Sequence, residues 1–259
     1  MILLHGFPEF WYGWRHQIRP LAAAGFRVLA PDQRGYNRSE KPPGTASYTR
    51  DRLAEDVVGL LDAAGLERAS VVGHDWGAAV AWHLAAAHPD RVARLVIINV
   101  PHPGVFQQHL RSSLGQLLKS WYIAFFQIPA LPEWFSRLGS WRLLAGALTA
   151  TSRPGTFSEE DLARYRESWS QPGACTAMLN WYRAAVREPV GNTSEARITA
   201  PTLVIWGARD RFLDQAMARP SAEAVDDGRL KIFPKATHWV HHEEVDRVNQ
   251  LLLDFLGEG

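Results

Sequence analysis

The chain has 259 residues, of which 46% are hydrophobic and 21% charged, a balance that excludes a disordered or fibrous protein. Its 28 Lys and Arg against 27 Asp and Glu leave a formal net charge of +1. The chain therefore lacks the excess charge that would predict a nucleic-acid or membrane partner. The single cysteine, Cys175, excludes an intramolecular disulfide. No apolar run approaches the roughly 18 residues of a membrane-spanning helix. No signal peptide follows Met1, so we expect a cytoplasmic globular protein.

Strand and helix patterns alternate over residues 1–100. Short apolar runs predict strands, and amphipathic stretches of about 12 residues between them predict helices. In chain order the predicted elements are a strand at 2–4, a helix at 11–24, a strand at 27–30, a polar loop at 32–47, a helix around 53–61 that stops at Gly65, a strand at 69–72, a helix at 76–87 and a strand at 94–99. This alternation is typical of a parallel sheet with helices on both faces.

From residue 101 to residue 195 the strand patterns stop and helices dominate, with predicted helices at 105–118, 158–168 and 174–186. The alternation then returns, with strands predicted at 202–206 and 229–233 and helices at 215–225 and 243–256. We therefore predict an α/β core made of residues 1–100 and 196–259. A helical cap, or lid, at 101–195 interrupts it.

The first motif that indicates catalysis is Gly-His-Asp-Trp-Gly at residues 73–77, at the junction of a predicted strand and helix. Its glycines permit a sharp turn that exposes the central side chain, Asp75, as a nucleophile. The alternative interpretation is an Asp that caps a helix beside ordinary turn glycines. Asp210 and His238 follow the next two predicted strands along the chain, so both are expected near Asp75 at the carboxyl edge of the sheet. The order nucleophile, acid, histidine predicts a catalytic triad.

With these motifs in view, the sequence resembles the α/β-hydrolase fold family, in particular the epoxide hydrolases and haloalkane dehalogenases that use an aspartate nucleophile. Residues 5–8 (HGFP) resemble the family's H-G-x-P segment, and residues 32–39 resemble its D-x-R-G-Y-x-x-S loop. Residues 99–103 resemble its connection into the cap, so the resemblance covers essentially the whole chain. It implies an oxyanion hole formed by the backbone N–H groups of Phe7 and Trp76.

Two cap segments, 121–127 and 180–183, resemble those that carry the paired ring-opening tyrosines of epoxide hydrolases. By this resemblance Tyr122 and Tyr182 point at the nucleophile, where a neutral phenol can donate a proton to an opening epoxide oxygen. The alternative is that both are packing residues of an aromatic cap. Phe126 and Trp239 are expected to line an apolar substrate cleft, together with Phe7 and Trp76.

The resemblance implies that Asp75 opens a small apolar epoxide to form an alkyl-enzyme ester. His238, oriented by Asp210, then activates a water that releases a vicinal diol. No metal or organic cofactor is expected, although His238, His241 and His242 are close together in the sequence.

Two alternatives remain at this level. A haloalkane dehalogenase would use the same Asp75, Asp210 and His238, with Trp76 as a halide ligand. Against it, Phe7 stands where many dehalogenases have Asn, and the two cap tyrosines would have no role. A catalytically idle ligand-binding protein on the same fold is the third hypothesis, since fold alone does not confer activity.

One feature departs from the family pattern. Relatives usually carry further strands before the strand that leads into H-G-x-P, whereas here that strand begins at Met1. Two interpretations are open: the start of the chain is misplaced or truncated, or the sheet lacks its first edge strands and exposes the edge of the strand at 2–4. An uncovered edge pairs readily with other chains, so we expect lowered stability or self-association, and a homodimer is possible.

Overall fold

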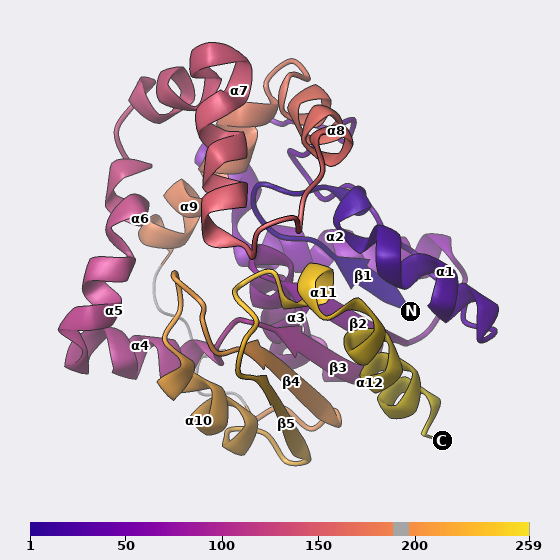
Figure 1. Cartoon of the computed structure of the whole chain (residues 1–259). Coiled ribbons are helices and arrows are strands. Elements are labelled where there is room, and N and C mark those ends of the chain that lie inside the picture. The colour runs from indigo at the N-terminus through magenta and orange to yellow at the C-terminus, as the bar shows by residue number, and fades with distance from the viewer. Residues whose placement is uncertain (189–196, 259) are drawn as a thin grey trace.

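The computed structural model describes residues 1–188 and 197–258 and contains one parallel sheet (Figure 1). Its strand order follows the chain: β1 (Ile2–Leu4), β2 (Ala69–His74), β3 (Val92–Ile98), β4 (Thr202–Gly207) and β5 (Gly228–Phe233). The register pairs Leu4 with Gly73 and Ile98 with both His74 and Ile205. The strands therefore end together at one edge of the sheet. This architecture confirms the predicted α/β-hydrolase fold class.

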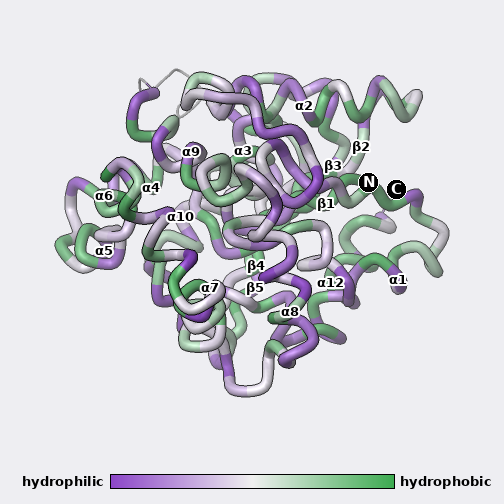
Figure 2. Tube along the Cα trace, turned by 90° about the horizontal axis from the view of Figure 1, so that it is seen from above, coloured by the Kyte–Doolittle hydropathy of each residue, from purple (hydrophilic) through white to green (hydrophobic). Residues whose placement is uncertain are grey.

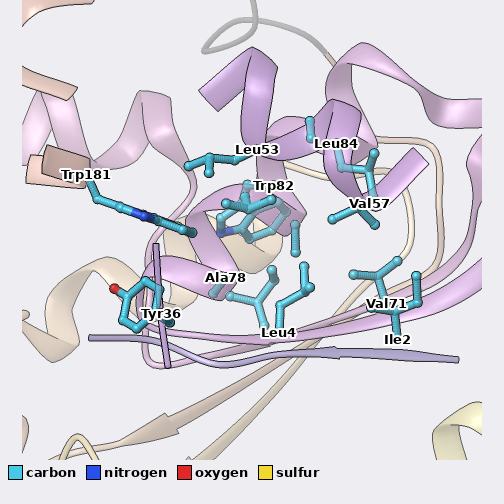
Figure 3. Packing of buried hydrophobic residues seen from close by; sticks show 14 of the residues in the cluster. Ile2, Leu4, Tyr36, Leu53, Val57, Val71, Ala78, Trp82, Leu84 and Trp181 are labelled. Atoms are coloured by element: carbon cyan, nitrogen blue, oxygen red, sulfur yellow. The ribbon is translucent and has the colours of Figure 1, made fainter. Parts of the chain in front are cut away.

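Side chains alternate between two hydrophobic cores on opposite faces of the sheet, as the strand period of two requires. On one face, Leu4 and Val71 pack against α2 (Arg50–Ala63) and α3 (Trp76–Ala87), and Figure 3 shows Trp82 lying over them. The other face is covered by α1 (Arg15–Ala23) and α12 (Val245–Gly257) and includes Leu3, Val72, Val96, Ile98 and Ile205. Burial on both faces explains why β3 is apolar almost without interruption.

In Figure 1 the helices between β3 and β4 begin at the left, level with the sheet, and continue above it. They are α4 (Pro103–Ser112), α5 (Leu114–Lys119), α6 (Trp121–Phe125), α7 (Leu131–Thr151), α8 (Glu159–Trp169) and α9 (Ala174–Arg187). Non-helical backbone at residues 138–141 divides α7 into two parts. We propose that these helices form the predicted cap. Its predicted boundary at residues 195 and 196 lies outside the described residues.

A buried tryptophan ties α9 to the core. The ring centroids of Trp181 and Tyr36 lie 5.4 Å apart, and Trp181 Nε1 donates a hydrogen bond to the Arg34 carbonyl at 3.0 Å. Figure 3 shows Trp181 reaching over Tyr36. The helix that carries Tyr182 is therefore held in place by packing and by a hydrogen bond.

Short elements complete the chain. The 3-10 turns are η1 (Trp11–Trp14), η2 (Thr45–Tyr48), η3 (Pro89–Arg91) and η5 (Gln215–Met217), and the short helices are α10 (Ala218–Glu223) and α11 (Val240–Glu243). Among the described residues, no helix has the length and apolar character needed to cross a membrane.

Three expectations were wrong in detail. The segment 27–30 forms one parallel bridge, between Leu29 and Ile2, instead of a strand, and Pro31 then lacks the N–H that could extend the pairing. The helix expected at 105–118 is two helices, because the Ser113 side chain caps α5 by accepting a hydrogen bond from Gln116 N. The helix expected at 215–225 is the shorter pair η5 and α10.

The expectation of an uncovered edge on β1 was also wrong. Leu3 N donates to the Leu29 carbonyl at 2.8 Å, and Leu29 N donates to the Met1 carbonyl at 2.9 Å. Two backbone groups on the outer side of β1, Leu3 N–H and the Met1 carbonyl, are therefore paired within the chain. This removes the physical reason given for self-association through that strand.

Candidate active site

Asp75 lies on a sharp turn between β2 and α3. Its backbone has φ 49° and ψ −124°, a conformation that a residue with a side chain rarely adopts. Two glycines allow the turn to pack closely. A Cβ on Gly77 would overlap the Leu4 carbonyl, and a Cβ on Gly6 would overlap the Asp75 side chain itself. The strain is thus maintained by close packing of the β1 loop against the turn.

The Asp75 carboxylate is held by a backbone donor and a histidine. Phe7 N donates to Oδ1 at 2.7 Å, and His238 Nε2 lies 3.3 Å from Oδ2. Trp76 is the first residue of α3, so its N–H is one of the free donors of a helix N-terminus. Burial alone would raise the pKa of Asp75, but the hydrogen bond and charge of His238 and the Phe7 donor lower it. Asp75 is therefore ionised.

His238 and Asp210 form a buried pair. His238 Nδ1 lies 2.7 Å from Asp210 Oδ2, while Phe212 N and Leu213 N donate to the other oxygen at 2.7 and 3.0 Å. Burial by itself would lower the pKa of His238. The charge of Asp210 and its hydrogen bond, with a further contribution from Asp75, instead raise it to about 10. The structure thus brings Asp75, His238 and Asp210 into one hydrogen-bonded line.

Asn99 is a supporting residue to which the sequence analysis gave no role of its own. It is fully buried just after β3, and its Nδ2 donates to Asp210 Oδ2 at 2.7 Å. Its Oδ1 accepts a hydrogen bond from Gly207 N at 2.8 Å. The φ of 54° suits asparagine, which tolerates the left-handed region better than most residues. The signal in the sequence that could have indicated Asn99 was a polar residue directly after a buried strand.

A second missed group surrounds Glu9, which is fully buried behind the triad. Glu9 accepts hydrogen bonds from Tyr165 Oη at 2.6 Å and His242 Nε2 at 2.8 Å, and His74 Nδ1 lies 3.2 Å from it. His74 Nε2 lies 3.0 Å from the His238 carbonyl oxygen. The network therefore links a buried carboxylate to the loop that carries the catalytic-site histidine. The signal was a Glu in an otherwise apolar stretch after the H-G-x-P segment.

The surroundings of Glu9 keep its carboxyl group ionised although it is buried. Burial would raise the pKa of Glu9, but the charge of His242 and hydrogen bonds from the surrounding histidines hold it well below its usual range. Ligand atoms of Glu9, His241 and His242 lie within 4.8 Å of one another, an arrangement that could hold a metal ion. Burial lowers the pKa of His242 and of His241. Because hydrogen bonds already engage both Glu9 oxygens, we interpret the group as a hydrogen-bonded network that positions the His238 loop.

The two cap tyrosines lie over the nucleophile. Tyr122 from α6 and Tyr182 from α9 have ring centroids 5.9 Å apart, and Tyr182 lies 4.9 Å from Trp76 and 5.2 Å from Phe7. Burial raises the pKa of both phenols, and the negative charge of Asp75 raises it further. Both are therefore protonated and able to donate.

Two apolar cavities meet at this point, since Asp75, Tyr122 and Tyr182 line both. The larger, of about 660 Å³, is also lined by His238 and by three of the four aromatic residues predicted for the cleft, Phe7, Phe126 and Trp239. The smaller, of about 360 Å³, extends the other way along Trp76, Val100, Phe106, Leu110 and Val186. The arrangement suits an apolar molecule whose reacting centre lies between the carboxylate and the phenols.

The parallel sheet, the strained turn and the nucleophile–acid–histidine arrangement define an α/β hydrolase. The chain belongs to that family, whose model, described as alpha/beta hydrolase fold, matches residues 1–245. Its relatives include epoxide hydrolase 4 of Homo sapiens, 39% identical over 265 residues that cover 100% of this chain and 72% of the relative. Epoxide hydrolase A of Mycobacterium tuberculosis is 36% identical over 293 residues, covering 99% of this chain and 89% of the relative.

Other comparisons agree. The AB hydrolase superfamily protein YfhM of Bacillus subtilis is 48% identical over 256 residues, covering 99% of this chain and 89% of the relative. A crystal structure of a Bacillus megaterium epoxide hydrolase with an inhibitor superposes with a TM-score of 0.89 at 31% identity, covering 100% of this chain and 93% of the other. The chain is thus an epoxide-hydrolase-like α/β hydrolase.

Proposed function

We propose that the protein hydrolyses apolar epoxides to vicinal diols by way of an ester on Asp75. The observation that carries the proposal is that two protonated phenols, Tyr122 and Tyr182, line the same cavities as an ionised Asp75. A carboxylate can displace at a saturated carbon only if the leaving oxygen is stabilised. Donors facing the nucleophile supply that stabilisation.

In the first step, Asp75 Oδ2 attacks one ring carbon of the epoxide while the bond from that carbon to the ring oxygen breaks. The oxygen takes its proton from Tyr122 or Tyr182, and the second phenol donates a hydrogen bond to it. Oδ1, which accepts from Phe7 N, remains as the ester carbonyl oxygen. The product of this step is a hydroxyalkyl ester of Asp75.

In the second step, His238 removes a proton from water, and the resulting hydroxide attacks Asp75 Cγ. The N–H groups of Phe7 and Trp76 stabilise the oxyanion that forms, and the bond from Cγ to the alkyl oxygen then breaks as His238 returns its proton to the leaving diol oxygen. The proton left on the Asp75 carboxyl group passes to the phenolate formed in the first step, which restores the ionised Asp75 and the neutral tyrosine. Esterification removes the negative charge of Asp75, one of the causes of the raised pKa of His238. The first step therefore prepares His238 to act as a base, while Asp210 keeps its orientation.

Product analysis with styrene oxide and 1-bromobutane tests the proposal. We expect diol from styrene oxide, no bromide release, and loss of diol formation in Asp75→Ala. His238→Gln should accumulate a covalent adduct on Asp75, visible by mass spectrometry, because ester formation continues and ester hydrolysis stops. Bromide release without diol would assign the protein to the haloalkane dehalogenases, and a folded enzyme inactive on both compounds would favour the idle binding protein.

The tyrosines can be tested separately. Tyr122→Phe and Tyr182→Phe should each slow ester formation by roughly 10²–10³-fold, the usual cost of one donor to a developing oxyanion. Tyr12→Phe is the matched control, because its hydroxyl donates to Asp161 at 3.0 Å and lines neither cavity. Equal rates in all three variants would show that the cap phenols only pack.

A further inference from the structure

Large apolar side chains are exposed around the mouth of the larger cavity. Leu118, Trp121, Phe135 and Leu143 line that cavity and are also 74%, 66%, 46% and 43% exposed. They belong to α5, α6 and α7, so parts of the cap that are separate in sequence surround one opening. Five more exposed apolar residues follow the same helices: Leu114, Leu117, Ile128, Leu131 and Trp134. We call these nine residues the apolar cap surface.

This concentration is specific to the cap. Elsewhere in the described part of the chain, the large apolar residues that are exposed are Trp11, Leu60 and Val186, which lie singly. In Figure 1 α5 and α6 stand at the margin of the molecule away from the sheet, and in Figure 2 they form its outer edge with hydrophobic stretches in green. Scattered exposed apolar residues are ordinary, whereas a group of nine indicates a surface that is covered by something else.

The charged residues of the helices that carry this surface are mostly basic. Between residues 103 and 152 the basic residues are Arg111, Lys119, Arg137 and Arg142, and the only acidic residue is Glu133. Glu133 is buried and pairs with Arg183 at 2.7 Å. The four basic residues form no ion pair with any residue in the described ranges. The helices that carry the apolar cap surface therefore also carry an excess of positive charge, of which Lys119 alone lies near a carboxylate of the described residues, that of Asp214.

This charge distribution distinguishes between two occupants. A second copy of the chain bound about a twofold axis would bring the same surface against itself, with the excess of cations from one copy facing that of the other. An anionic lipid bilayer offers both an apolar interior for Leu and Trp side chains and negative headgroups for Arg and Lys. Trp121 and Trp134 have the amphipathic rings that favour the headgroup level of a membrane.

We propose that the apolar cap surface docks on anionic phospholipid bilayers, with the mouth of the larger cavity facing the lipid. The docking rests on this surface alone. That the lipid then delivers apolar epoxides to the cavity rests in addition on the proposed function. The earlier expectation of no membrane partner followed from a net charge of +1, which averages the basic cap with the rest of the chain.

Vesicle sedimentation of the full chain tests the docking. We expect the protein to sediment with vesicles of equimolar phosphatidylglycerol and phosphatidylcholine, to bind phosphatidylcholine vesicles weakly, and to be released by salt. Arg137→Gln with Arg142→Gln should lower the partition coefficient by roughly fivefold for each charge removed. Leu117→Ser with Trp134→Ser, neither of which lines the cavity, should abolish binding.

Matched controls come from the core. Leu60→Ser on α2 and Arg19→Gln on α1 remove one exposed apolar and one exposed basic residue away from the cap and should leave sedimentation unchanged. Absence of vesicle binding by the wild type, or equal losses in cap and control variants, would overturn the proposal. A wild-type dimer that Trp134→Ser converts to a monomer, without vesicle binding, would assign the surface to a second copy. Diol formation by Arg137→Gln/Arg142→Gln in solution separates failed docking from failed chemistry.

Discussion

Replacing Asn99 by alanine should destabilise the protein more than almost any other single change outside the hydrophobic core. The substitution removes the donor at 2.7 Å from Asp210 and leaves Gly207 N without its acceptor, at a fully buried position. A hydrogen bond to a charged group contributes about 1.5–3 kcal/mol, and an unsatisfied buried N–H costs about 1–3 kcal/mol. An alanine at φ 54° adds about 1–2 kcal/mol of backbone strain.

The free energy of unfolding should therefore fall by about 4–8 kcal/mol, a large part of the roughly 5–15 kcal/mol available to a typical domain. Urea unfolding followed by tryptophan fluorescence measures this directly. Asn99→Gly is the matched variant, because it loses the same hydrogen bonds but tolerates the backbone conformation, and it should be about 1–2 kcal/mol more stable than the alanine variant. If both variants unfold within about 1 kcal/mol of wild type, the buried network does not stabilise Asp210 as argued.

Two further predictions concern the turn and the triad. Gly77→Ala should lower the free energy of unfolding by at least about 3 kcal/mol, because the added methyl group overlaps the Leu4 carbonyl. Gly59→Ala is the control, since its methyl group meets nothing within 4 Å and should stabilise α2 slightly. Similar urea midpoints for the two variants would contradict the packing argument. For pH, the folded state holds the pKa of His238 at about 10, above its ordinary value of 6.5. Its stabilising contribution is then complete below pH 6.5 and is lost as pH rises to about 10. Asp210→Asn should flatten that part of the stability profile, and parallel profiles for the two proteins would rule out Asp210 as the cause.

Local patterns were enough to predict the residues that the proposed mechanism uses. The glycines of residues 73–77 and the polar residues after two predicted strands led to Asp75, Asp210 and His238 because the carboxyl ends of parallel strands share one edge. The pairing of Tyr122 with Tyr182 came from resemblance, since no periodicity in a helical segment says which residues of two distant helices meet.

Other features depended on contacts that are distant in the sequence. Nothing local indicated that Leu29 pairs with Ile2, or that Glu9 contacts His242 across 233 residues. Net charge likewise concealed the basic surface of the cap, because composition carries no information on which side chains the fold leaves exposed.

The sequence by itself determined the class of fold and the chemical groups at the carboxyl edge, because these follow from hydrophobic periodicity and from turn residues acting over a few positions. Only the tertiary structure decided the buried partners of Asp210, the network around Glu9 and the side of the cap left uncovered. These depend on packing between segments that are distant in the sequence, as between Asn99 and Asp210 or Glu9 and His242, where the free energy of a contact is set by burial and geometry that no local pattern encodes.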